Sequence, residues 1–321
     1  MDRTDPRRDL YRFDLYSYFY GLVRQIERGR VSTYGALARA LGDIAASRAC
    51  GYMLSINPDP QNTPCYRVVK SDSSVWKFTH MLGISEKIRR LTNDGISVID
   101  GRVENFDSLC FSNFEADYPL NSMRQEQTRI VNLVDLNDRD FSDNVGAIDV
   151  SYDDYNGYGS FIYTDGGKTH IRNCILPVRF PYIPGYLAFR EYRFIEELCK
   201  GFSGTLLIDG NGYLHPRRVG LASLAGVLLG IQTIGVAKSL MFGMVQDGWI
   251  YSGEERIGYM MNKNTIVSAG HMTELESAVK FVKSLNGGRY PNLLKIAHDS
   301  TVKLRTENTS PIFEGKEHAG N

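Results

Sequence analysis

Apolar residues in the first third of the chain recur every three or four positions, which is the spacing of amphipathic helices. Such stretches cover Phe19–Ala40, with a turn at 27–30, then Ser47–Ile56 and Ile84–Asn93. The prolines of the segment 57–60 end the second stretch, and a β-like run at Tyr66–Lys70 follows. The pattern predicts a compact helical unit with a helix-turn-helix character.

Beyond residue 122 short apolar runs of strand length become the dominant feature. After a helical stretch at Ser122–Val134, three runs follow one another closely, at Val145–Ser151, Gly159–Thr164 and Thr169–Val178. Strand-like runs at Thr205–Ile208 and Thr233–Ala237 then alternate with helical stretches at Leu187–Lys200 and Leu221–Leu229. The pattern predicts an α/β protein with a mixed sheet and helices on both faces.

Residues 104–121 have no clear period and mix Asn, Ser, Asp and aromatic residues. We therefore expect a first domain over 1–103, a linker over 104–121 and a second domain over 122–321. A hydrophobic fraction of 42% and a charged fraction of 23% are typical of globular proteins. No apolar run has the length of a membrane span or of a signal peptide core, so a cytoplasmic location and no membrane partner are expected.

Charge and cysteine usage narrow the picture further. Residues 1–106 carry 16 Lys and Arg against 12 Asp and Glu, and the balance is reversed in the remainder, which weakly favours nucleic acid as a partner of the first domain. The five cysteines include no CxxC pair. Neither a disulfide framework nor a zinc knuckle is expected.

Three carboxylates of the second domain are candidates for a metal site. Asp149 lies within the apolar run VGAIDVSY, Asp209 ends the apolar run TLLID, and Glu191 stands near the start of a helical stretch. Charges in such places are costly, and hard oxygen ligands that converge at one sheet edge suit Mg²⁺ or Mn²⁺. Spacing alone equally allows two strand ends and one solvated helix residue.

Longer strings decide between these interpretations. PYIPGYLAFRE, LLIDGNGYLHPRRVGLASLAGVLL, TIGVAKS and VSAGH occur in this order, and residues 122–299 resemble the endonuclease V family. The resemblance implies a ribonuclease H-like fold and Mg²⁺-dependent hydrolysis of a phosphodiester 3′ to deoxyinosine, with Mn²⁺ as a substitute. It assigns metal binding to Asp149, Glu191 and Asp209, electrostatic help at the phosphate to Lys238, and a place among the catalytic residues to His271.

The segment Pro181–Gly185 is a loop stiffened by two prolines. The resemblance implies that this loop places Tyr182 and Ile183 in the gap left by an extruded base. The base would then enter a pocket near Gly185, Leu187 and Gly210. His215 is a further candidate for contacts to the lesion. The family commonly has His where this chain has Asn211.

A second set of strings lies in the first domain. VSTYGALARALG, RACGY, Asn57-Pro58 and PCYRVV resemble the DNA-binding and active-site portion of O6-alkylguanine-DNA alkyltransferases and alkyltransferase-like proteins. The resemblance covers about Phe19–Val103 and implies a small winged-helix-like domain. It implies that Arg48 replaces the extruded nucleotide, Tyr34 rotates the phosphate, Asn57 forms a hinge and Cys65 accepts the alkyl group.

One departure from this family concerns the active site itself. The motif PCHR reads PCYR here, so Tyr66 replaces the histidine that helps to deprotonate the cysteine, and Asp94 stands where a glutamate usually orients that histidine. Tyrosine, with a reference pKa of ~10, is the poorer base near neutrality. Because alkyltransferase-like proteins usually lack the acceptor cysteine, its presence favours alkyl transfer.

Three functions remain open from the sequence. The leading hypothesis is a bifunctional DNA-repair enzyme that acts on DNA containing O6-alkylguanine or deoxyinosine. In the second, the first domain only binds alkylated DNA and the nuclease is the sole enzyme. In the third, the nuclease also cuts inosine-containing RNA, because the pocket recognises a base and not its sugar.

Overall fold

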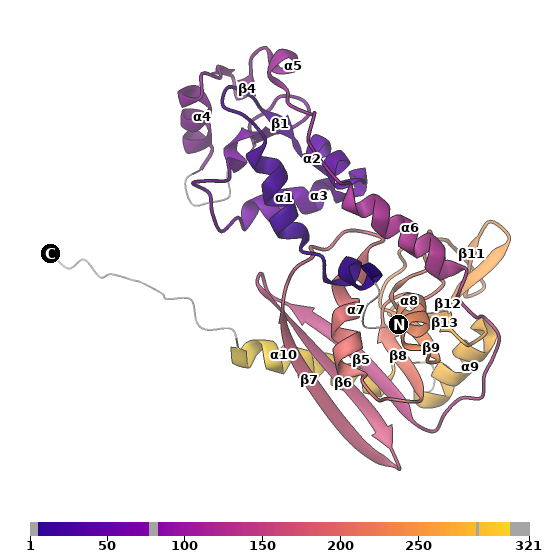
Figure 1. Cartoon of the computed structure of the whole chain (residues 1–321). Coiled ribbons are helices and arrows are strands. Elements are labelled where there is room, and N and C mark those ends of the chain that lie inside the picture. The colour runs from indigo at the N-terminus through magenta and orange to yellow at the C-terminus, as the bar shows by residue number, and fades with distance from the viewer. Residues whose placement is uncertain (1–5, 77–82, 287–288, 309–321) are drawn as a thin grey trace.

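The computed structural model of the chain describes residues 6–76, 83–286 and 289–308, arranged as a small helical part beside a larger part built on one sheet (Figure 1). The helical part contains α1 (Leu15–Arg24), α2 (Tyr34–Leu41), α3 (Ser47–Ser55) and α4 (Gly83–Asn93). Short elements join them: η2 (Ile44–Ala46), η3 (Cys65–Arg67), and the parallel pair β1 (Ser32–Thr33) and β2 (Val68–Val69). The small hairpin β3 (Val98–Ile99) and β4 (Arg102–Val103) and the short α5 (Phe106–Leu109) complete it.

Local sequence explains where α2 begins and ends. Thr33 caps its first turn by accepting a hydrogen bond from the Ala36 backbone N–H (3.0 Å). Gly42 ends it in the left-handed conformation, with φ +103°. A Cβ at Gly42 would lie 2.9 Å from the backbone nitrogen of Asn121, so the residue also permits close packing against the next part of the chain. The helical stretches expected on either side of a turn at 27–30 are thus α1 and α2, and the short strand β1 lies between them.

The larger part begins with α6 (Pro119–Val131), which starts within the segment expected as a linker and packs against α2 and α8. Its nine-stranded sheet has the order β10-β11-β12-β13-β9-β8-β5-β6-β7. The strands are β5 (Val145–Tyr152), β6 (Asn156–Asp165), β7 (Lys168–Pro177), β8 (Thr205–Asp209), β9 (Thr233–Ala237), β10 (Met244–Gln246), β11 (Trp249–Ser252), β12 (Glu255–Asn262) and β13 (Thr265–His271). β5, β8 and β9 are parallel, and the other neighbours are antiparallel.

Helices cover both faces of this sheet, which confirms the predicted mixed α/β architecture. α7 (Leu187–Leu198) and α8 (Leu221–Leu229) pack with Ile148, Leu206 and Ile208 in one core. α9 (Leu275–Asn286) and the start of α10 (Asn292–Asn308) pack with Ala147 and Leu207 in another. Adjacent residues of β5 and β8 thus face opposite layers, as the alternation of a strand requires. The sequence pattern had not predicted β10 to β13, α9 or α10.

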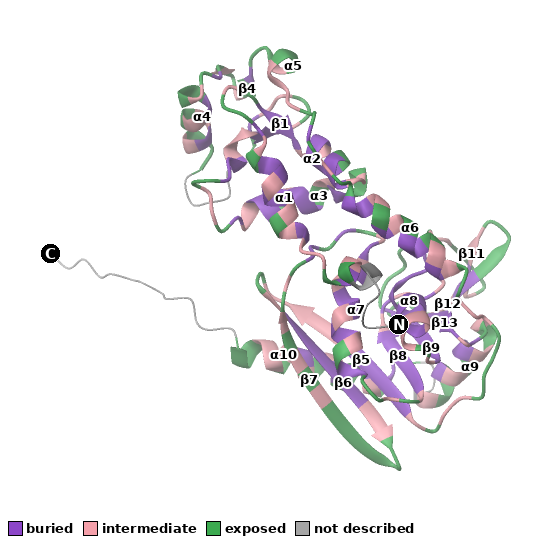
Figure 2. Ribbon diagram, in the orientation of Figure 1, coloured by how far each residue is buried: buried purple, intermediate pink, exposed green. Residues whose placement is uncertain are grey.

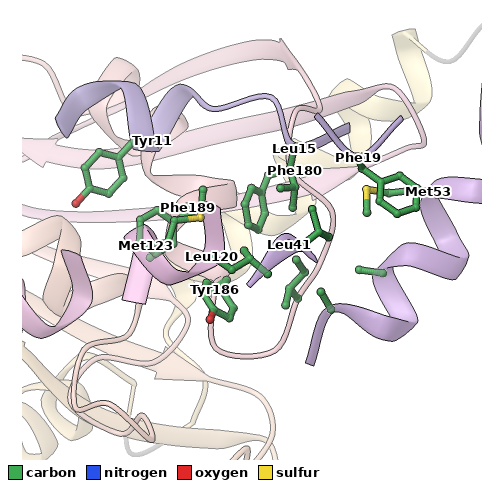
Figure 3. Packing of buried hydrophobic residues seen from close by; sticks show 14 of the residues in the cluster. Tyr11, Leu15, Phe19, Leu41, Met53, Leu120, Met123, Phe180, Tyr186 and Phe189 are labelled. Carbon is green, nitrogen blue, oxygen red and sulfur yellow. The ribbon is translucent and has the colours of Figure 1, made fainter. Parts of the chain in front are cut away.

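The first of these cores extends into the helical part. Buried side chains of α1 and α2, such as Leu15 and Leu41, lie in one cluster with Leu120, Phe180 and Tyr186 of the larger part (Figure 3). Burial is accordingly continuous where the two parts meet (Figure 2). The segment η1 (Pro6–Arg12), although first in sequence, packs on α7, where Tyr11 stacks on Phe189 with ring centroids 5.4 Å apart. Within the described ranges no helix is long and apolar enough to cross a membrane.

Candidate functional sites

Two carboxylates lie side by side at one edge of the large sheet. β5 and β8 are parallel neighbours whose last paired residues are Ile148 and Ile208, and Asp149 and Asp209 follow them directly. Glu191, in the second turn of α7, faces the same place, since its charge interacts with both aspartates. The three predicted metal-binding residues are therefore brought together from three elements.

Two nitrogen groups complete this edge. Lys238 follows β9 and places its Nζ 2.6 Å from Asp209 Oδ2. His298, on α10, lies with Nδ1 2.7 Å from Asp149 Oδ2, so that a ring N–H donates to the carboxylate. The Tyr290 ring stands 5.2 Å from the Lys238 ammonium. Lys238 was predicted from the sequence, whereas His298 was not.

The carboxylates repel one another in a poorly solvated place. Burial, followed by the charge of Asp149, raises the pKa of Glu191 well above its usual range and also raises the pKa of Asp209. A divalent cation bound by oxygen ligands would offset this repulsion, so the donor set fits Mg²⁺ or Mn²⁺. In the present side-chain arrangement, no three acidic, imidazole or thiol groups of the described residues are close enough to hold an ion.

His271 does not belong to this edge. It ends β13 and pairs with Thr233, the first residue of β9, whereas Lys238 lies beyond the other end of β9. A strand of five residues spans about 17 Å, so the two side chains stand at opposite ends of the sheet. His271 is buried, its ring nitrogen accepts the Asp135 backbone N–H (3.1 Å), and burial lowers its pKa. The catalytic role expected for His271 is thus not supported, and its position indicates a structural role.

A cavity of about 440 Å³ opens beside the carboxylate edge and reaches Asp209 and Lys238. Its wall includes the predicted pocket residues Gly185, Leu187, Gly210 and His215, together with Tyr182 and Asn211. Gly185 has φ +81°, and a Cβ there would lie 2.8 Å from the Arg217 guanidinium. A side chain at this position would therefore be strained and would crowd Arg217.

In the loop Pro181–Gly185, only one of the two side chains expected at its tip is exposed to solvent. Tyr182 is 58% exposed, whereas Ile183 is fully buried in the core. The expectation that both residues stand at the tip of the loop is therefore wrong for Ile183. Gln127 Nε2 and Arg217 Nη2 donate to the Gly185 carbonyl, at 3.0 and 2.7 Å, and hold the loop in place.

His215 lines the cavity as a neutral ring. Burial, together with the charge of Arg217, lowers its pKa to about 4. Its Nδ1 accepts the Arg217 backbone N–H (3.1 Å). A hydrogen bond of the ring with the Gly185 backbone opposes this shift, so His215 supports the loop that lines the cavity without adding charge there.

The second site surrounds Cys65, at the start of η3. The thiol is buried, and Asn57 Nδ2 donates to its sulfur (2.7 Å), so these two predicted residues are in contact. Tyr34, at the start of α2, lies close enough for the Cys65 charge to raise the pKa of its phenol, after the larger effect of burial. Arg48 is exposed on the first turn of α3.

Tyr66 is turned toward Asp94, the residue expected to orient it. Its hydroxyl donates to Asp94 Oδ2 (3.0 Å), and Arg67 Nε donates to the same oxygen (2.6 Å). Burial and this hydrogen bond raise the pKa of Tyr66, so it retains its proton near neutrality. Burial also raises the pKa of Cys65 to about 11, although Asn57, Lys87 and Arg90 act in the opposite direction. The thiol is therefore mainly protonated at neutral pH, and the thiolate is a minor species there.

Sequence reasoning missed two residues at these sites. His298 stands in the string AHDS, where nothing local distinguishes it from a surface histidine, because its role depends on the packing of α10 against β5. Lys87 lies on an amphipathic helix, where a lysine is normally solvated. The structure buries it to 2% exposure.

Comparison with known proteins finds a family for each of the two parts of the chain. Residues 125–299 match the family model "Endonuclease V", and residues 14–96 match "6-O-methylguanine DNA methyltransferase, DNA binding domain". A bifunctional methyltransferase/endonuclease of Picrophilus torridus is 50% identical over 92% of this chain and 98% of its own length. One from Thermoplasma volcanium is 45% identical over 95% and 94%.

Among solved structures, endonuclease V of Ciona intestinalis superimposes with a TM-score of 0.54 at 27% identity, over 60% of this chain and 99% of that one. That structure is a complex with a DNA containing an inosine followed by a ribo-adenosine.

Fold and sites together define a DNA-repair protein in which a methyltransferase-type DNA-binding part and a nuclease share one chain. The chain belongs to the family of bifunctional methyltransferase/endonucleases. The predicted combination of an alkyltransferase domain and an endonuclease V domain is confirmed. Nucleases of the endonuclease V family depend on a metal ion.

Proposed function

We propose that the nuclease part hydrolyses a phosphodiester 3′ to deoxyinosine in DNA with Mg²⁺, or with Mn²⁺ in its place. The observation that carries this proposal is the juxtaposition of Asp149, Asp209 and Lys238 with a cavity that reaches Asp209. Asp149, Glu191 and Asp209 would hold the metal. A metal bound there supplies an activated water and stabilises the departing oxygen.

The chain's own residues have separate roles in this reaction. Lys238 offsets negative charge at the phosphate, and His298, held by Asp149, is available to orient a water or move a proton. Tyr182 fills the gap in the duplex when the base leaves its stack, because it is an exposed aromatic residue on a stiff loop. The cavity beside Gly185, Gly210 and His215 receives the extruded base.

We further propose that Cys65 accepts the alkyl group of O6-alkylguanine in a single, stoichiometric transfer. The contact of Asn57 with the sulfur supports this role, since a hydrogen bond to sulfur stabilises a thiolate. Arg48 is placed on α3 to enter the duplex, and a planar cation can stack there in place of the extruded nucleotide. Tyr34 lies near the acceptor and is suited to contact the phosphate.

One observation favours a second candidate for the helical part, which is lesion binding without transfer. The Tyr66 hydroxyl donates a hydrogen bond to Asp94, and its raised pKa means that it keeps its proton and does not act as the base for the thiol. One labelling experiment distinguishes alkyl transfer to Cys65 from lesion binding without transfer. DNA with labelled O6-methylguanine is incubated with the wild type, Cys65→Ala, and the control Cys110→Ala, which changes a partly exposed thiol of the same part.

The transfer proposal expects label on the peptide around Cys65 in the wild type and in Cys110→Ala, and none in Cys65→Ala. Lesion binding with no labelled protein would leave the nuclease as the sole enzyme. In parallel, all three proteins should nick deoxyinosine DNA in Mg²⁺, whereas Asp149→Asn and Asp209→Asn should not. Normal nicking by either aspartate variant would contradict the metal site. An inosine-containing RNA of the same sequence tests the sugar preference.

A further inference from the structure

Lys87 is a buried cation beside the alkyl-acceptor site. It lies on the inner face of α4, which packs against η3, and only 2% of the residue is exposed. Its Nζ donates to the Val68 carbonyl (2.6 Å), three residues after Cys65. Burying an ammonium is costly unless an opposite charge compensates for it.

The neighbouring carboxylates do not compensate this charge. Glu86 binds Arg89 and Arg90, with N–O distances of 2.6 and 2.8 Å. Asp94, just after α4, binds Arg67 and Tyr66. Burial lowers the pKa of Lys87 to about 8, and the charge of Cys65 opposes this shift. Lys87 is therefore still mainly charged at neutral pH, and a thiolate at Cys65 is the anion placed to pair with it.

Among the residues that the structure describes, the other groups around the sulfur do not supply this positive charge. Tyr20 from α1 and Tyr34 from α2 have a raised pKa, chiefly through burial, and stay neutral. Asn57 donates a hydrogen bond but carries no charge. Arg90, which also faces the site from α4, is already paired with Glu86.

We propose that the Lys87 ammonium is the counter-charge of the Cys65 thiolate, and thereby the positioning residue that allows alkyl transfer with Tyr66 in the place of histidine. The proposal rests on the proposed transfer to Cys65. The Cys65 thiol loses its proton to solvent, and its lone pair forms a bond to the alkyl carbon as the bond from that carbon to O6 breaks. The guanine leaves with this electron pair and takes up a proton at N1, so the step is balanced.

The pH profile distinguishes this role from a structural one. Below about pH 8 the thiolate forms beside a charged Lys87, and its population rises about tenfold per pH unit. Above that pH the thiol form loses the Lys87 proton instead, so the population of the thiolate and ammonium pair levels off. A lysine that only supports the Val68 carbonyl produces no such inflection.

The test measures the rate at which Cys65 reacts with iodoacetamide from pH 6.5 to 9.5 in the full-length protein without DNA, with peptide mapping to isolate Cys65. Lys87→Met removes the charge at similar length, and Lys87→Gln keeps a donor for the Val68 carbonyl. Arg89→Gln, on the exposed side of the same helix, is the matched control. Single-turnover transfer from O6-methylguanine DNA and nicking of deoxyinosine DNA are measured for each protein.

Both Lys87 variants should lose the inflection near pH 8, react at least tenfold more slowly at neutral pH and slow transfer to a similar degree, with nicking unchanged. Arg89→Gln should match the wild type. An unchanged pH profile in both Lys87 variants, or full recovery in Lys87→Gln, overturns the proposal. If wild-type protein transfers no alkyl group but the inflection depends on Lys87, the charge pair stands and alkyl transfer itself is refuted.

Discussion

The hydroxyl of Tyr186 donates to Asp43 Oδ2 across 2.6 Å and joins the two catalytic parts of the chain. Tyr186 directly follows the loop that carries Tyr182, and it is fully buried. Asp43 caps η2, just before α3, by accepting the Ala45 backbone N–H (3.0 Å). The loop that carries Tyr182 and the segment just before α3 are therefore joined by a partly buried hydrogen bond, in addition to the shared core.

This contact and the shared core predict that the two parts unfold together. Trp76 lies in the helical part and Trp249 in the sheet, so Trp76→Phe and Trp249→Phe leave one fluorescent reporter in each. Urea transitions followed by either reporter should coincide. Tyr186→Phe should lower the free energy of unfolding by about 1.5–3 kcal/mol, because it removes a hydrogen bond to a charged group. Two separate midpoints in the proteins with single tryptophans would show that the parts fold independently.

The two histidines of the nuclease part should behave in opposite ways. His298→Ala should reduce nicking of deoxyinosine DNA by about 10²-fold or more with little change in stability, because the ring is half exposed and contacts Asp149. His271→Ala should lower the melting temperature and retain nicking at a permissive temperature, because the ring is buried far from the carboxylates. Nicking rates and thermal melts of both variants decide the assignment, and the reverse pattern would refute it.

Substitutions of Tyr182 and Ile183, two adjacent residues of the loop Pro181–Gly185, should affect DNA binding and stability differently. Tyr182→Ala should weaken binding to deoxyinosine DNA about tenfold more than binding to undamaged DNA, since stacking against bases contributes about 1–3 kcal/mol. Its stability should change by no more than about 0.5 kcal/mol. Ile183→Ala should instead cost about 2–5 kcal/mol of stability, because it opens a cavity in the core. Equal loss on both DNAs for Tyr182→Ala would indicate a purely structural loop.

Alkyl transfer to Cys65 should accelerate as the pH rises from 6 to 8. Because burial raises the pKa of Cys65 to about 11, the thiolate is a minor species throughout this range, and its population rises about tenfold per unit. Single-turnover transfer of labelled methyl from DNA measures the slope. A flat profile would show that deprotonation of the thiol does not limit transfer.

Tyr66→His should increase the transfer rate at neutral pH. A histidine at this position can donate one ring N–H to Asp94, as Tyr66 does, and leave the other nitrogen free to accept the thiol proton. Tyr66→Phe is the control, because it removes the hydroxyl without adding a base. An equal rate in Tyr66→His and Tyr66→Phe would mean that the missing base is not limiting.

Much of the nuclease site could be predicted from the sequence, because its residues directly follow apolar runs that form strands. Asp149 and Asp209 each follow a run of apolar residues, and parallel strands bring their carboxyl ends to one edge. Lys238 follows β9, which is parallel to β8, so its position at the same edge could be predicted for the same reason. Long strings of residues also identified both families before any contact was known.

Other features depended on contacts between distant segments. His298 is 149 positions from Asp149, and His271 and Ile183 were misassigned because a motif does not reveal which face its side chains present. Lys87 appears solvated in the sequence and is buried only because α4 packs over η3. The sequence by itself determined which chemical groups each part of the chain carries, since apolar runs and motifs are local properties. Only the tertiary structure decided which groups meet, because burial and charge pairing arise from packing between elements far apart in the chain.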